Sequence, residues 1–77
     1  MDIYEDIKTY SLDVCNEMLK AFDYDERAIL LQYEKKSKVL DSLAKMYNMS
    51  TPDFVQNKRN GFNDMRKAIY KRIEELK

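Results

Sequence analysis

The chain contains only one glycine and one proline, and this scarcity constrains its fold more than any other feature. Turns between β-strands depend on both residue types, so a β protein of this length would need many more of them. Charged residues make up 36% of the 77 residues, as is typical of helices with solvated outer faces. The sequence therefore predicts an all-α fold, a compact bundle of four to five short helices, in a single domain over residues 1–77.

Cys15 is the only cysteine, and the chain has no histidine. These counts exclude an intrachain disulfide and a zinc-ligand cluster, and we expect neither a metal nor a cofactor. Without an imidazole base or a glycine-rich phosphate loop, we expect a binding protein and not an enzyme. Cys15 lies on the apolar side of its predicted helix and is expected to be a buried small hydrophobe.

The chain carries no apolar run approaching the length of a membrane span, and its first residues are acidic. Together with the lone cysteine, these features predict a cytoplasmic protein with no membrane partner. A core this small is often stabilised by a disulfide, a metal or a partner subunit. The first and last predicted helices both carry long apolar stripes. We therefore predict a homodimer.

Apolar residues recur at spacings of three and four along the first 22 residues. This pattern predicts an acidic N-terminal helix over residues 1–22, beginning with Asp2 as its cap. Asp23 and Glu26 have the spacing of a capping box and predict the start of a second helix there.

The five residues from Glu34 to Lys38 are all polar, so a helical turn there would have no apolar contact on any face. This run favours a break, followed by a third helix that Ser37 caps. The alternative is one unbroken helix from Tyr24 to Asn48, because nothing in the run forbids helix.

The remaining helix boundaries are predicted by residues that commonly cap or end helices. Asn48 is expected to adopt the left-handed conformation that ends a helix, and Ser50 precedes Pro52 as a cap precedes a first-turn proline. A fourth helix is predicted from Pro52 to Asn60, where the pair formed with Gly61 predicts a stop. A fifth helix then follows to the C-terminus.

The formal net charge of zero conceals two halves of opposite charge. Residues 1–42 carry ten acids against six bases, and residues 43–77 carry eight bases against four acids. A chain of this kind can present different faces to different partners.

The segment from Leu40 to Arg59 resembles the helix-turn-helix unit of bacterial transcription regulators. Leu43 and Tyr47 stand at apolar positions of its first helix, and Ala44 stands where the two helices touch. In the same comparison Met49 is the apolar turn residue and Phe54 anchors the second helix, whereas Asn48 replaces the usual glycine and Asn57 replaces a second apolar anchor. Residues 24–73 as a whole resemble the DNA-binding fourth region of sigma factors and the phage regulators related to it, although Gly61 interrupts what is usually a continuous recognition helix.

The resemblance implies that the helix from Pro52 to Asn60 enters the major groove of double-stranded DNA. The implied base readers are the amides of Gln56, Asn57 and Asn60. The implied phosphate contacts are Lys45, Lys58, Arg59, Arg66 and Lys67. Asp53 lies on the same helix and would repel phosphate.

A role in protein binding is the alternative. Six tyrosines and five methionines supply side chains that interfaces favour. An acidic face could imitate the phosphate backbone and block a host protein that binds nucleic acid, in the manner of small phage-encoded inhibitors. The candidate residues for this face are Asp13, Glu17, Asp23, Asp25 and Glu26.

Overall fold

The computed structural model describes residues 3–77 as four helices, with no strand in that range. The helices are α1 (Ile3–Ile7), α2 (Leu12–Glu34), α3 (Lys38–Met46) and α4 (Thr51–Glu75). The prediction of an all-α fold is confirmed. The same described residues include no helix long and apolar enough to cross a membrane.

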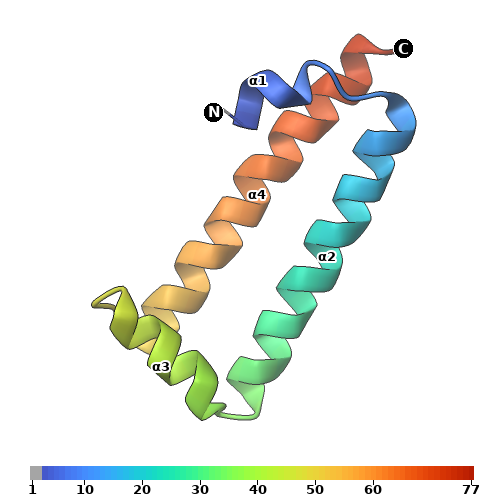
Figure 1. Cartoon of the computed structure of the whole chain (residues 1–77). Coiled ribbons are helices and arrows are strands. Elements are labelled where there is room, and N and C mark those ends of the chain that lie inside the picture. The colour runs from blue at the N-terminus through green and yellow to red at the C-terminus, as the bar shows by residue number, and fades with distance from the viewer. Residues whose placement is uncertain (1–2) are drawn as a thin grey trace.

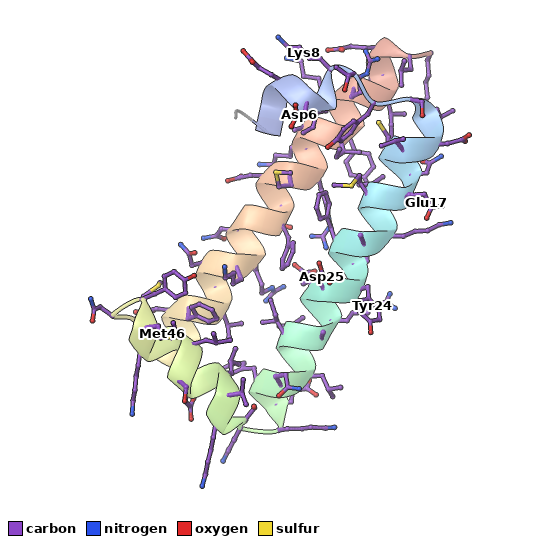
Figure 2. All side chains as sticks on the ribbon, in the orientation of Figure 1. Asp6, Lys8, Glu17, Tyr24, Asp25 and Met46 are labelled. Carbon is purple, nitrogen blue, oxygen red and sulfur yellow. The ribbon has the colours of Figure 1, made fainter. Side chains whose placement is uncertain are left out.

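The two long helices, α2 and α4, run side by side in opposite directions and form a helical hairpin (Figure 1). α1 lies against the C-terminal half of α4, and α3 closes the other end of the hairpin (Figure 1). Lys8 and Met46 mark these two ends (Figure 2). The molecule is therefore elongated, with extents of 43 × 23 × 15 Å, and not the compact bundle that the sequence predicts.

The N-terminal part of the chain forms two helices where one was predicted. α1 ends at Ile7, and α2 begins after Ser11, whose hydroxyl accepts a hydrogen bond from the Val14 amide at 3.3 Å. The prediction of a single helix over residues 1–22 is wrong, because a local cap at Ser11 restarts the helix. The predicted cap at Asp2 lies outside the described residues.

α2 continues without interruption through Asp23, so the capping box predicted there is wrong. It ends at Glu34, and Lys36 takes a left-handed conformation with φ 54°. The Ser37 amide donates to the Gln32 carbonyl and the Lys36 amide to the Tyr33 carbonyl, at 3.0 and 3.1 Å. This pair of bonds is a Schellman motif, and it confirms the predicted break over the alternative of one unbroken helix.

α4 also passes through a position where a boundary was predicted. Gly61 lies within it and has no positive φ, so the predicted stop is wrong. A glycine inside a helix costs about 1 kcal/mol relative to alanine, which the burial of flanking apolar residues can offset. Phe54 and Val55 before it and Ile69 after it are all buried.

The core consists of two clusters, one toward each end of the hairpin. The first contains Ile7, Cys15, Phe22 and Ile69, and the second contains Leu40, Ala44, Phe54 and Val55. Cys15 is fully buried, as predicted. Four residues of the first predicted stripe, Ile7, Tyr10, Met18 and Phe22, pack in one cluster with four of the last, Phe62, Met65, Ile69 and Ile73. These residues contact each other inside one chain, and the homodimer stays a prediction.

Replacing Gly61 by Ala is expected to raise the free energy of unfolding by about 0.5–1 kcal/mol. The added methyl group would meet no atom within 4 Å, and the substitution removes the entropic cost of glycine. Urea denaturation measures the change. Ala21→Gly, at an exposed position of α2, is the matched control and should lower stability by a similar amount. A loss of stability in Gly61→Ala would contradict an unbroken α4.

Candidate nucleic-acid interface

The turn between α3 and α4 is built around Asn48. Its φ is 55°, which confirms the left-handed conformation predicted for it. The Asn48 amide donates to the Lys45 carbonyl and the Met49 amide to the Ala44 carbonyl, both at 3.0 Å. These bonds form a second Schellman motif, which reverses the chain within a few residues. Asparagine tolerates this conformation better than most residues, so it can stand in the position of the usual glycine.

The start of α4 is fixed by two side-chain hydrogen bonds. The Ser50 hydroxyl accepts from the Asp53 amide at 3.3 Å, which confirms the predicted cap, and Pro52 lies in the first turn. The Thr51 hydroxyl donates to Asp41 Oδ1 on α3 at 2.6 Å. This second bond ties the two helices together directly. Sequence reasoning missed it, because no local pattern links residues ten positions apart.

The second core cluster holds α3 against α4 and α2. Ala44 is only 1% exposed and Phe54 is 4% exposed, so both fill the positions predicted for them, and Met49 packs against the same cluster. Leu43 and Tyr47, which stand at apolar positions of the first helix in the helix-turn-helix comparison, are 40% and 61% exposed. α3 is rotated so that Leu40 and Ala44 point inward instead.

Asn57 is exposed, and the buried residue near it is Val55. The second anchor of α4 is thus a residue adjacent to Phe54 and does not fall at the position that the helix-turn-helix pattern specifies. Lys58 is partly buried, with its Nζ 5.6 Å from the ring centroid of Tyr47 and 5.4 Å from that of Phe54. A cation over two rings is held close to the turn.

The three predicted base readers all lie on the exposed surface of α4. The Gln56 amide nitrogen donates to Asn60 Oδ1 at 2.9 Å, one helical turn away. This bond restricts the rotation of both amides and leaves donors and acceptors of each free to face outward. Lys45, Arg59 and Lys67 are exposed as well.

Basic residues gather at the end of the hairpin where α3 meets the start of α4. Residues 35–60, which run from the end of α2 to the middle of α4, carry six bases and two acids, a net charge of +4. The bases are Lys35, Lys36, Lys38, Lys45, Lys58 and Arg59. Because the whole chain has no net charge, the rest of it carries −4. The fold therefore separates charge along its length.

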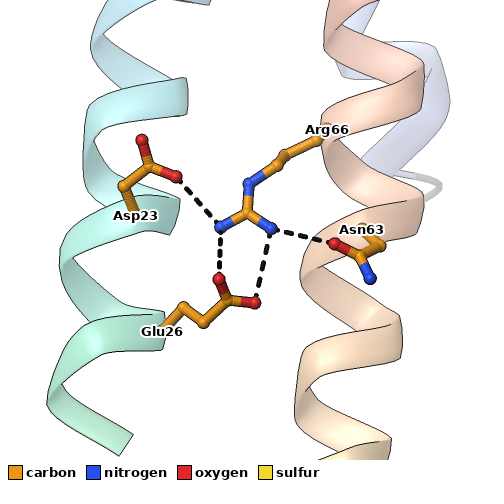
Figure 3. Close-up of polar contacts among 4 residues, drawn as sticks. All are labelled: Asp23, Glu26, Asn63 and Arg66. Atoms are coloured by element: carbon orange, nitrogen blue, oxygen red, sulfur yellow. Dashed lines mark hydrogen bonds and ion pairs between the residues drawn. The ribbon is translucent and has the colours of Figure 1, made fainter. Parts of the chain in front are cut away.

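Arg66 lies between the two long helices and not on the basic surface (Figure 3). Its Nη1 and Nη2 donate to the two carboxylate oxygens of Glu26 at 3.3 and 3.1 Å, and Nη2 also donates to Asp23 at 3.0 Å. Nη1 donates in addition to Asn63 Oδ1 at 3.0 Å. The hydrogen bond to Glu26, with help from Asp23, raises the pKa of Arg66 despite its burial. The side chain is only 16% exposed.

The same contacts divide the candidate acidic face. Glu26 is 19% exposed and, like Asp23, is paired with Arg66. Asp13, Glu17 and Asp25 remain exposed on α2. Two of the five acids thus hold the hairpin together, and sequence reasoning, which assigned Asp23 and Glu26 to a helix cap as well, did not find their partner.

No family model, curated protein or solved structure matches this chain. The resemblance to a helix-turn-helix unit therefore stays a prediction from the sequence.

Replacing Arg66 by Ala is expected to lower the free energy of unfolding by about 1–3 kcal/mol, because Glu26 would stay partly buried without its partner. Thermal or urea denaturation measures the loss. Arg59→Ala removes an exposed arginine from the same helix and should change stability by less than about 0.5 kcal/mol. Arg66→Lys keeps the charge but cannot form the fork, so it should fall between the two. Equal stabilities for the two alanine variants would contradict a structural role for Arg66.

Replacing Asn48 by Val is expected to destabilise the protein by about 1–2 kcal/mol, because a β-branched side chain is strained at φ 55°. Asn48→Gly should leave stability unchanged or raise it slightly, since glycine adopts this conformation freely. Urea midpoints distinguish the two variants. If both had the same stability, the left-handed turn would be wrong.

Proposed function

We propose that this chain is a small DNA-binding transcription regulator of the kind found in phages, and that its α3–α4 end binds double-stranded DNA. The observation that carries the proposal is the left-handed turn at Asn48. It joins two helices that share a buried contact at Ala44, and it presents an exposed polar face on the second helix. The continuity of α4 through Gly61 also removes one departure from the sigma-factor pattern.

The proposed recognition surface is the outer face of the first half of α4. Gln56, Asn57 and Asn60 have the amide groups that pair with the donor and acceptor of adenine in the major groove. Their backbone is regular helix, which fits that groove. The amide bond between Gln56 and Asn60 favours this role because it holds two of the three groups in a defined orientation before DNA arrives.

The proposed phosphate contacts come from the basic end of the hairpin. Lys45, Lys58, Arg59 and Lys67 remain in this role, and Arg66 is left out because its guanidinium is engaged by Glu26 and Asp23. The net charge of +4 over residues 35–60 supplies the attraction that a DNA-binding end needs. The Asp53 carboxylate lies on the same surface and would repel the DNA phosphates.

Binding to a fluorescently labelled mixed-sequence duplex is expected to weaken with salt, at a slope of about −0.9 in log affinity against log salt for each phosphate neutralised. Lys45→Ala and Arg59→Ala should each weaken binding to all duplexes and flatten the slope by about one unit. Fluorescence anisotropy over a series of salt concentrations measures both quantities. Lys8→Ala, an exposed lysine at the α1 end, is the matched control and should change neither.

Three further variants distinguish sequence-specific recognition of DNA bases from non-specific electrostatic binding to phosphates. On a preferred site selected from random duplexes, Gln56→Ala or Asn57→Ala should cost about 1–3 kcal/mol, with non-specific binding unchanged. Asp53→Asn should tighten binding to every duplex. If no duplex is retained at low salt, while Asp13→Lys or Glu17→Lys abolishes capture of a host nucleic-acid-binding protein, the DNA proposal is wrong and the acidic inhibitor takes its place.

A further inference from the structure

Exposed apolar side chains are concentrated in one part of the molecule. Eleven large apolar residues are exposed among the described residues, and seven of them lie between residues 24 and 47. They are Tyr24, Leu31, Tyr33, Val39, Leu43, Met46 and Tyr47. Tyr24 is 75% exposed and projects from α2 away from α4 (Figure 2). Tyr24 and Leu31 lie on the outer face of α2, and Val39, Leu43 and Met46 are exposed on α3. Tyr33 lies on the opposite face of α2 from Tyr24, and Tyr47 packs against Phe54, so neither belongs to this outer apolar surface.

A groove runs between these two helices. Its α2 wall is formed by Ala28, Ile29 and Gln32, and its α3 wall by Val39, Leu40 and Leu43. It holds about 150 Å³ and its surface is almost entirely apolar. Leu31 adjoins the α2 wall in sequence and is 48% exposed.

The chain exposes more surface than a compact monomer of its size. Its accessible area is 5982 Å², whereas a folded monomer of 9.3 kDa exposes about 5,000 Å². Its radius of gyration is 14.6 Å, against about 11.5 Å for a compact domain of 77 residues. The surplus of about 1,000 Å² is close to the area of about 800 Å² that each partner buries in a standard protein interface.

The outer face of α2 has the pattern of a helix that packs against another helix. Tyr24, Ala28, Leu31 and Lys35 follow one another at spacings of four, three and four, which places them on one stripe opposite the core. Arg27 and Glu34 lie on the same flank of this stripe, seven residues apart, and both are exposed. Among the described residues, neither side chain forms an ion pair or a hydrogen bond within the chain.

We propose that this stripe and the adjoining groove bind a second copy of the chain, with the two α2 helices antiparallel about a two-fold axis. In such a pair, residues on one flank of a helix meet the same flank of its partner. Arg27 of each copy then faces Glu34 of the other, and Leu31 of each copy packs on Ala28 of the other. Arg27 and Glu34 have opposite charges, so the surface is complementary to a second copy of this chain. The two-fold axis forms the Arg27–Glu34 pair twice.

This arrangement leaves the proposed DNA surface free. The stripe lies on the side of α2 opposite its buried face, and Gln56 and Asn60 lie on the outer face of α4. The inference does not depend on DNA binding. The experiment that tests it contains no DNA, so either proposal can fail while the other stands.

Sedimentation equilibrium across micromolar to millimolar protein tests the proposal, and the wild type should approach twice the monomer mass of 9.3 kDa. Arg27→Glu and Glu34→Arg should each weaken association by about tenfold, because each puts like charges opposite one another twice. The double variant, Arg27→Glu with Glu34→Arg, should restore it. Recovery in the double variant identifies these two residues as partners across the interface, which a general loss of folding could not produce.

Leu31→Glu should weaken association by about a hundredfold, since it places a charge in the centre of the contact on both copies. Val14→Glu, at an apolar residue near the start of α2 that is 42% exposed, is the matched control and should have no effect. Circular dichroism melts confirm that each variant is folded. A wild type that stays monomeric at millimolar concentration, or a dimer that both single charge reversals leave intact, would overturn the proposal.

Discussion

The fork between Arg66 and Glu26 is the interaction on which the rest of the structure depends. It joins the middle of α2 to the middle of α4, with Asn63 accepting a second hydrogen bond from Nη1 and Asp23 a second from Nη2, and it lies between a core cluster at each end of the hairpin. The Arg66 side chain is only 16% exposed, and close acidic partners offset the cost of removing most of its charge from water. Asp23 and Glu26 therefore pair with Arg66 and do not cap a helix, and α2 continues through Asp23 as one long helix.

The sequence predicts correctly those helix boundaries that local residues decide, and it fails where the pairing of α2 with α4 decides. The turn at Asn48, the cap at Ser50 and the break before Ser37 follow from local chemistry, because each is decided by residues within one helical turn. The boundaries at Asp23 and Gly61 were predicted by equally good local signals and are absent. At both places the pairing of α2 with α4 outweighs a helix-propensity cost, which is about 1 kcal/mol for Gly61 and smaller for Asp23, and a local pattern does not show that pairing.

In the candidate site, too, some features follow from the local sequence and others depend on how the helices pack. Exposure of Gln56, Asn57 and Asn60 was predictable, since they lie on the polar side of an amphipathic helix. The rotation of α3, which buries Leu40 and exposes Leu43, was not, because both are leucines and only the packing of α2 and α4 chooses between them. The same rotation creates the groove between α2 and α3. One packing choice thus decides both which residues of α3 contact α4 and which line the apolar groove beside α2.

The fold separates a basic α3–α4 end from an acidic remainder, and we propose that the basic end binds DNA. A two-dimensional NMR titration of the labelled protein with a mixed-sequence duplex shows where DNA binds, because it reports every amide separately. We expect the largest shifts in the side-chain amides of Gln56, Asn57 and Asn60 and in the backbone around Asn48, with Asp13 and Glu17 unchanged. Shifts confined to the first half of α2, or no shifts at low salt, would contradict it.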